Sequence, residues 1–126
     1  MTNSAVFLQP AFILQQRKYR ETSFIIDALT RDFGRISLLA KGVRKTKSPT
    51  AGLLQPFRPL NVSYFGKAEL KTLTNVEITK PFEPLQGVAL YCGFYVNELI
   101  TCFLHKYDPH PEVFELYETC LSCLLE

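Results

Sequence analysis

The sequence predicts a small closed β-barrel of five strands followed by an all-α segment, an α+β chain overall. Between residues 7 and 80, five short runs alternate apolar and polar side chains, and no segment of helix length separates them. After residue 81 the apolar side chains recur at steps of three and four, which is the period of a helix. Five short strands joined by turn residues favour a barrel over a parallel sheet with crossover helices.

The five strands are predicted in chain order, each bounded by turn residues. Phe12 and Leu14 alternate with their neighbours in the first strand, and Asp32 and Gly34 form the turn between the second and third, because Gly34 can adopt a positive φ. The second to fifth strands are expected at residues 22–29, 35–40, 59–65 and 69–79. Four phenylalanines are expected in the core, namely Phe7, Phe12, Phe24 and Phe57. Alternation in the fifth strand places one set of side chains on one face, namely Leu70, Thr72, Thr74, Val76 and Ile78.

Two helices are predicted after the barrel. The first covers residues 85–103 and is apolar on so many sides that we expect it to be buried on most of them. The second begins near Pro111, with Glu112 where the helix dipole favours negative charge, and its apolar stripe reaches the last residues without a capping residue. We therefore expect a barrel domain, residues 1–80, and the beginning of a helical domain, residues 81–126, of a longer polypeptide.

The net charge of +2 conceals a division between two parts of the chain. Residues 1–80 carry 13 Lys and Arg against 5 Asp and Glu, whereas residues 81–126 carry 1 Lys against 7 acidic residues. The two parts thus have net charges of +8 and −6 and are expected to face different partners. No signal peptide is visible, and the longest later uncharged run, 14 residues, is too short to cross a bilayer, so we expect a cytoplasmic protein without a membrane contact.

Residue patterns for catalysis or metal binding are sparse. His105 and His110 share no helix face, and the glycines are isolated turn residues that form no phosphate-binding loop. Cys120 and Cys123 have the spacing of half a zinc site, but Cys120 falls on an apolar stripe, so core packing is favoured. All four cysteines are expected to act as small buried hydrophobes. We expect neither an enzyme nor a metal or other cofactor.

Basic residues concentrate in two connections of the barrel. Residues 17–20 place three cations around Tyr19, and residues 41–52, expected to form a solvated loop, hold four more. Such cations can follow a phosphate backbone, and a base can stack on Tyr19. The candidate DNA contacts are Arg17, Lys18, Tyr19, Arg20, Arg35, Lys41, Arg44, Lys45 and Lys47. Three carboxylates near these cations are expected to form surface ion pairs, namely Glu21, Asp27 and Asp32.

Five motifs follow one another between residues 19 and 70. They are Tyr19-Arg20-Glu21-Thr22, Thr30-Arg31-Asp32-Phe33-Gly34-Arg35, Ala40-Lys41-Gly42-Val43-Arg44, Leu54-Gln55-Pro56-Phe57-Arg58-Pro59-Leu60 and Gly66-Lys67-Ala68-Glu69-Leu70. In this order they resemble the bacterial DNA repair and recombination protein RecO family, and residues 85–126 resemble the family's next segment.

The resemblance implies that the barrel is a five-stranded OB-fold and that the protein is a nucleoid-associated recombination mediator of the RecF pathway. It implies binding to single- and double-stranded DNA and annealing of complementary strands. It also implies that the protein works with RecR and single-stranded-DNA-binding protein so that RecA can load onto DNA. Some family members carry a zinc site later in the helical region, but that site is not transferred to Cys120 and Cys123.

Two alternatives remain open from the residues alone. An RNA-binding OB module of the translation or ribosome-associated kind needs the same cations and aromatic rings, since RNA also presents phosphates and bases. A protein-interaction scaffold needs only that the basic barrel faces an acidic partner. Neither composition nor spacing separates these functions.

Overall fold

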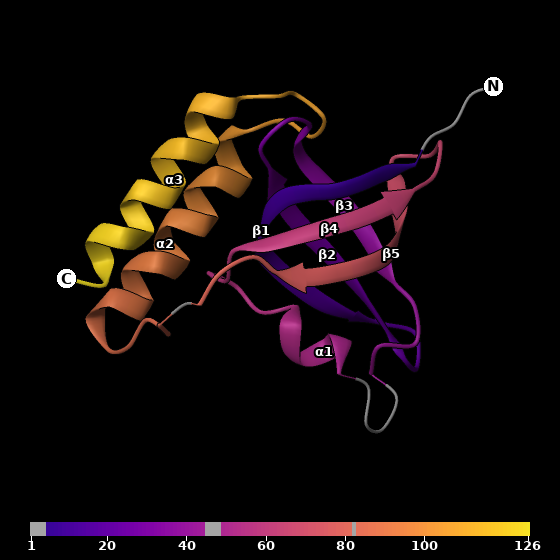
Figure 1. Ribbon diagram of the computed structural model, residues 1–126, viewed down its shortest axis with the longest axis horizontal. Helices are drawn as coiled ribbons and strands as arrows, with labels where there is room; N and C mark the ends of the chain where they lie inside the picture. The colour runs from indigo at the N-terminus through magenta and orange to yellow at the C-terminus, as the bar shows by residue number, and fades with distance from the viewer. Residues whose placement is uncertain (1–4, 45–48, 82) are drawn as a thin grey trace.

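The computed structural model describes residues 5–44, 49–81 and 83–126, which form a five-stranded barrel with two long helices beside it (Figure 1). The strands are β1 (Val6–Tyr19), β2 (Ser23–Thr30), β3 (Gly34–Ala40), β4 (Leu60–Phe65) and β5 (Leu70–Ile78). They close in the order β1-β2-β3-β5-β4, with β3 parallel to β5 and all other neighbours antiparallel. The helices are α1 (Thr50–Leu53), α2 (Val88–Phe103) and α3 (Pro111–Leu124). This closed strand order is that of an OB-fold, so the predicted barrel followed by helices is confirmed.

The interior of the barrel is filled from all five strands, because alternate residues of a strand point to the same face. The buried cluster consists of Ala11, Ile13, Ile26, Ala28, Ile36, Leu38, Ala40, Val43, Leu54, Leu60, Val62, Tyr64 and Val76. Ala51 and Leu53 of α1 pack against this cluster, so α1 closes one end of the barrel. Part of the predicted solvated loop is therefore a short packed helix.

The predicted single face of the fifth strand is wrong. The register of β4 and β5 shifts along the pair, so that Leu73 and Val76 both pack toward the barrel core. Leu70 and Ile78, at the two ends of β5, are exposed. A shift of this kind adds a residue to one strand and breaks the alternation of its side chains.

Three of the four phenylalanines predicted in the core pack in or against an apolar cluster, and Phe7 does not. Phe7 is 74% exposed, because the pairing of β1 with β4 is interrupted between Val6 and Gln9. Phe57 lies in no strand but packs against Phe94 of α2, with ring centroids 5.2 Å apart. Phe12 is buried in an apolar cluster, and Phe24 and Phe57 are half-buried and pack against one, so the core prediction is confirmed for these three.

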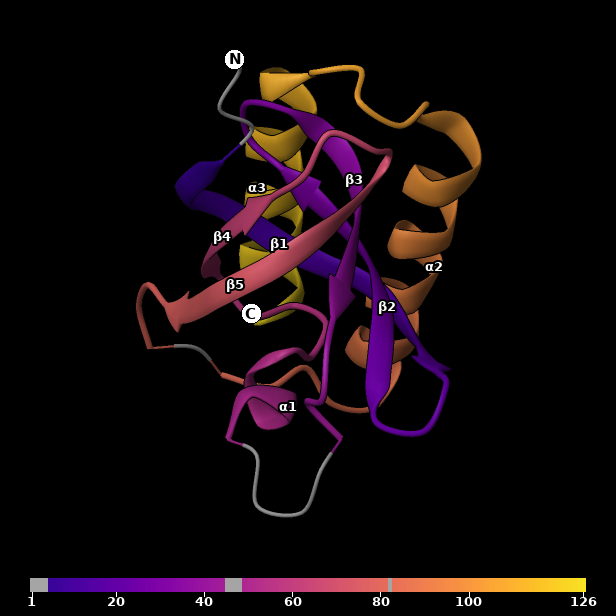
Figure 2. The ribbon, with the colours of Figure 1, turned by 90° about the vertical axis from the view of Figure 1, so that its right-hand side faces the viewer.

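A second apolar cluster joins the barrel to the helices. It contains Phe12, Leu14, Leu29, Leu85, Phe114, Tyr117 and Leu121. The ring of Phe12 contacts those of Phe114 and Tyr117, with centroids 5.4 and 5.0 Å apart. Figure 1 shows α2 and α3 antiparallel on one side of the barrel, and in the perpendicular view the strands lie in front of α3 (Figure 2). The domain boundary near residue 81 stays a prediction, and this cluster contains side chains from both sides of it.

The predicted burial of the first long helix on most sides is wrong for the described residues. Only Gly93 and Asn97 of α2 are buried, whereas Val88, Tyr91 and Phe103 are 77–78% exposed. Cys92, Cys102 and Cys123 are exposed and Cys120 is half-buried, so the expectation of buried cysteines is also wrong. The one buried face of α2 lies where Gly93 approaches the ring of Phe57 closely, since a Cβ at position 93 would lie 2.8 Å from that ring. None of the described helices is both long and apolar enough to cross a membrane.

Asn97 connects three elements through a buried hydrogen-bond network. Its Nδ2 donates to the backbone carbonyl of Leu14 at 3.0 Å, and the hydroxyl of Tyr117 donates to its Oδ1 at 2.6 Å. Leu14 lies where the register of β1 with β2 shifts, between Ile13 and Gln15. Burial raises the pKa of Tyr117, which keeps its hydroxyl protonated as a donor. The amide thus ties β1 to both long helices.

The turn between α2 and α3 packs against the beginning of β3. The backbone N–H of Tyr107 donates to the carbonyl of Arg35 at 2.8 Å. The Tyr107 hydroxyl donates to the backbone carbonyl of Glu69, and burial raises the pKa of Tyr107. Gly34 has φ +73°, as its predicted turn role requires, and a Cβ there would lie 2.5 Å from the carbonyl oxygen of Asp108. Only glycine therefore permits this approach of the turn to the barrel.

Replacing Asn97 by alanine should lower the free energy of unfolding by about 2–4 kcal/mol, because two buried groups lose their partner. Urea unfolding followed by circular dichroism measures this change. Asn75→Ala is the matched control, since Asn75 is exposed and its side-chain amide donates to the exposed Glu77. A loss for Asn97→Ala no larger than that of the control would contradict the structural role of the network.

Replacing Gly34 by alanine should destabilise the chain by about 2 kcal/mol or more, because a left-handed φ disfavours any Cβ and the new methyl also meets the Asp108 carbonyl. Gly52→Ala is the control, since a Cβ there meets no atom within 4 Å and φ is not positive. Thermal unfolding of the two variants compares them directly. Equal melting temperatures would show that the turn does not need glycine at position 34.

Candidate nucleic-acid interface

The outer face of β1, β2 and β3 is divided between the helices and solvent. The part that carries Phe12 and Leu29 is covered by the cluster shared with α3. Farther along the same strands, the register aligns Arg17 with Ile25 and Ile25 with Leu39. Arg17 is exposed, and the other two are half-buried. The uncovered part of this face, with the loops at its end, contains most of the predicted contact residues.

A hollow of about 380 Å³ lies where the β1–β2 loop meets the end of β3, and we call it the loop hollow. Its lining residues are Tyr19, Arg20, Thr22, Ser23, Leu39, Lys41 and Gly42. It brings together three predicted contacts, Tyr19, Arg20 and Lys41, from segments distant in sequence. Arg20 and Lys41 are exposed, and the Arg20 guanidinium lies 5.2 Å from the centroid of the Tyr19 ring. The hollow therefore combines two cations with one aromatic ring.

Arg44 holds the two loops of the loop hollow together. Its Nε donates to the carbonyl of Ser23 at 3.0 Å, and its Nη2 donates to the carbonyl of Arg20 at 2.7 Å. Its backbone N–H donates to the carbonyl of Thr22 at 2.8 Å, and its guanidinium lies 5.8 Å from the centroid of the Phe24 ring. The side chain thus positions the β1–β2 loop, and its predicted phosphate contact stays a prediction.

The side chain of Arg35 forms three hydrogen bonds, one within the barrel and two to the end of α2. Its Nε pairs with Asp27 at 3.1 Å, and only 13% of its side chain is exposed. Its Nη1 donates to the carbonyls of Thr101 and Leu104, at 2.7 and 2.6 Å, at the end of α2. A cation is favourable there because the last carbonyls of a helix lack partners within the helix. Arg35 joins the barrel to α2, and a phosphate contact from it stays a prediction.

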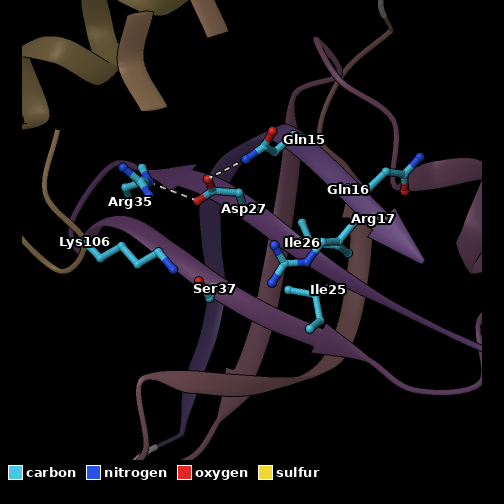
Figure 3. A pocket seen from close by; sticks show the side chains of 9 residues that line it. All are labelled: Gln15, Gln16, Arg17, Ile25, Ile26, Asp27, Arg35, Ser37 and Lys106. Carbon is cyan, nitrogen blue, oxygen red and sulfur yellow. Dashed lines mark hydrogen bonds and ion pairs between the residues drawn. The ribbon is translucent and has the colours of Figure 1, made fainter. Parts of the chain in front are cut away.

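A second hollow, of about 230 Å³, lies on the strand face, and we call it the strand hollow (Figure 3). Its lining residues are Gln15, Gln16, Arg17, Ile25, Ile26, Asp27, Arg35, Ser37 and Lys106. Lys106 comes from the turn between α2 and α3 and was not among the predicted contacts. Its Nζ lies 3.8 Å from a carboxylate oxygen of Glu69. One sequence signal could have indicated Lys106, because it is the single Lys or Arg among residues 81–126.

The other predicted contacts lie apart from the two hollows or outside the described residues. Lys18 is exposed and lies opposite Phe24 in the register of β1 with β2. Phe24 packs on the barrel core, and neighbouring residues of a strand point to opposite faces, so Lys18 and Arg17 lie on different faces of β1. Lys45 and Lys47 fall outside the residues that the structure describes. Contacts of these three lysines with nucleic acid stay predictions.

Two of the three carboxylates near these cations, Asp27 and Asp32, form ion pairs, and the pair of Asp32 lies at the surface as predicted. Arg31 and Asp32 form an exposed pair at 3.2 Å, and the Arg31 guanidinium, helped by the amide of Gln9, lowers the pKa of Asp32. The pair of Asp27 with Arg35 is more buried than the predicted surface pair, with 11% of the Asp27 side chain exposed. In the part of the chain that the structure describes, no group of three or more His, Cys, Asp or Glu side chains is placed to hold a metal ion.

The strand order defines an OB-fold protein, and the part of its outer face that the helices leave open carries the loop hollow and the strand hollow. Residues 3–82 match the family model described as recombination protein O N terminal, and residues 84–126 match the one described as recombination protein O C terminal. The chain belongs to the recombination protein O family.

Curated relatives carry the name DNA repair protein RecO. The chain is 52% identical over 116 residues to the protein of Burkholderia pseudomallei, covering 92% of this chain and 42% of that protein. It is 50% identical to the protein of Paraburkholderia xenovorans, covering 92% and 39%. It is 46% identical to the protein of Glaesserella parasuis, covering 92% and 48%. The chain therefore spans less than half the length of these relatives.

Proposed function

We propose that this chain forms the nucleic-acid-binding part of a recombination mediator in DNA repair. The observation that carries the proposal is the loop hollow, in which Tyr19, Arg20 and Lys41 meet on the open face of an OB-fold barrel. The relatives' name, DNA repair protein, favours DNA as the ligand. In the proposal the protein binds single- and double-stranded DNA, anneals complementary strands, and helps RecA load together with RecR and single-stranded-DNA-binding protein.

The proposed chemistry is electrostatic and needs no catalytic group. Arg20 and Lys41 pair with phosphates and release counterions, and Tyr19 offers a ring on which a base of any identity stacks. Arg44 keeps the loop hollow in shape through its bonds to the carbonyls of Arg20 and Ser23. Neutralising two phosphate backbones lowers their mutual repulsion, so weak contacts without sequence preference let two strands search for their register.

Reversing the charge of Arg20 or Lys41 to glutamate should weaken binding of a single-stranded oligonucleotide about 3- to 10-fold and reduce the salt slope by about 0.7 per lost phosphate contact. Fluorescence anisotropy at several salt concentrations measures both quantities. Lys80→Glu makes the same charge change at an exposed position beyond β5 and is the matched control. Unchanged affinity and slope in both loop variants would refute the DNA-contact assignment and favour a protein-interaction scaffold.

Competition between DNA and RNA oligonucleotides of matched sequence separates the mediator from an RNA-binding module. We expect DNA to compete at least as well as RNA for a labelled DNA probe. The loop hollow offers phosphate and ring contacts that both ligands share, so a preference must come from the sugar. A strong preference for RNA would contradict the mediator function while leaving the loop hollow as a binding site.

A further inference from the structure

We propose that the strand hollow holds one phosphate of a nucleic-acid backbone between Arg17 and Lys106. When no nucleic acid is bound, the Glu69 carboxylate forms an ion pair with Lys106 in place of the phosphate. The inference rests on the proposed function and adds to it a contact from the helical segment. It also gives the negatively charged residue Glu69 a defined role, as an internal competitor for the lysine.

The position of Lys106 is the first argument. Residues 81–126 have a net charge of −6, and Lys106 is their single Lys or Arg. The fold brings this cation onto the basic barrel, where the segment around it is held by the bond from the Tyr107 N–H to the Arg35 carbonyl. Figure 3 shows Arg17 and Lys106 reaching into the hollow from opposite sides, with Ser37 between them in that view.

The charge balance inside the strand hollow is the second argument. Its one carboxylate, Asp27, is occupied at both oxygens, by Arg35 Nε at 3.1 Å and by Gln15 Nε2 at 3.3 Å. Among the described residues, the side chain of Arg17 forms no hydrogen bond or ion pair. An anion entering the hollow therefore meets two cations, Arg17 and Lys106, without a competing charge from Asp27. The volume of about 230 Å³ is several times the ~30 Å³ of a liquid water molecule, so a hydrated phosphate group fits.

The ion pair of Lys106 with Glu69 is the third argument. The atoms are 3.8 Å apart, at the long end of ion-pair distances, and 70% of the Glu69 side chain is exposed. Exposed pairs of this kind are weak, so a phosphate that also contacts Arg17 displaces the carboxylate. Glu69 stays near Lys106 because the Tyr107 hydroxyl donates to its backbone carbonyl. Removing the Glu69 charge should therefore strengthen nucleic-acid binding.

The test measures affinity and salt slope of the 126-residue chain for a fluorescent oligothymidine. Lys106→Gln and Arg17→Gln should each weaken binding about 3-fold or more and reduce the slope by about 0.7. Glu69→Gln should strengthen binding about 2-fold at low salt, and Lys106→Arg should retain the wild-type affinity. Lys80→Gln and Glu77→Gln are matched controls at exposed positions that line neither hollow. Circular dichroism shows whether each variant is folded.

The outcomes separate the two proposals. If the wild-type chain does not bind the oligonucleotide, both the proposed function and the phosphate site are overturned. If the Arg20 and Lys41 variants lose affinity but Lys106→Gln and Arg17→Gln behave like Lys80→Gln, only the phosphate site is overturned. If Glu69→Gln gains no more affinity than Glu77→Gln, the competition by Glu69 is overturned. Loss of affinity in Lys106→Gln together with its retention in Lys106→Arg supports the site.

Discussion

One buried amide, that of Asn97, sets how the helices meet the barrel. Its Nδ2 donates to the Leu14 carbonyl on β1, and its Oδ1 accepts from the Tyr117 hydroxyl on α3. One side chain of α2 therefore fixes the relative position of three elements. Apolar contacts around Phe12 favour association of the helices with the barrel, but they are not directional. Hydrogen bonds with defined donors and acceptors are directional, and a buried group left without one is costly. The amide therefore selects one arrangement among those that apolar packing permits.

That arrangement decides which part of the barrel remains open. The helices cover the strand face around Phe12 and Leu29, and the loop hollow lies beyond the covered part. Arg35 lies where the covered and open parts meet, bonded to the end of α2 and to Asp27. The same docking carries Lys106 to the strand hollow. The open face is thus a product of the barrel and the helices together.

Alternation and turn residues predicted the strands well, because both depend on neighbours in sequence. The turn at Gly34 follows from such local signals, and so does the position of Arg20 and Lys41 in two connections of the barrel. That these two connections meet in one hollow does not, because they are distant in sequence. The bonds of Arg35 to α2 and the place of Lys106 in the strand hollow could not be predicted in this way, because the residues that they meet are distant in sequence. The exposed side of α2 was also missed, since an apolar pattern shows which residues prefer burial but not whether a neighbour covers them.

The aromatic contacts of Phe12 with Phe114 and Tyr117 have a consequence for how the family varies. The two family models meet near residue 83, yet these rings pair residues from both. A larger or smaller side chain on β1 leaves either a clash or a void beside α3. Substitutions at these positions should therefore arise as compensating pairs among homologues. A chimaera with the barrel of one species and the helices of another should be less stable wherever the two species differ at these rings.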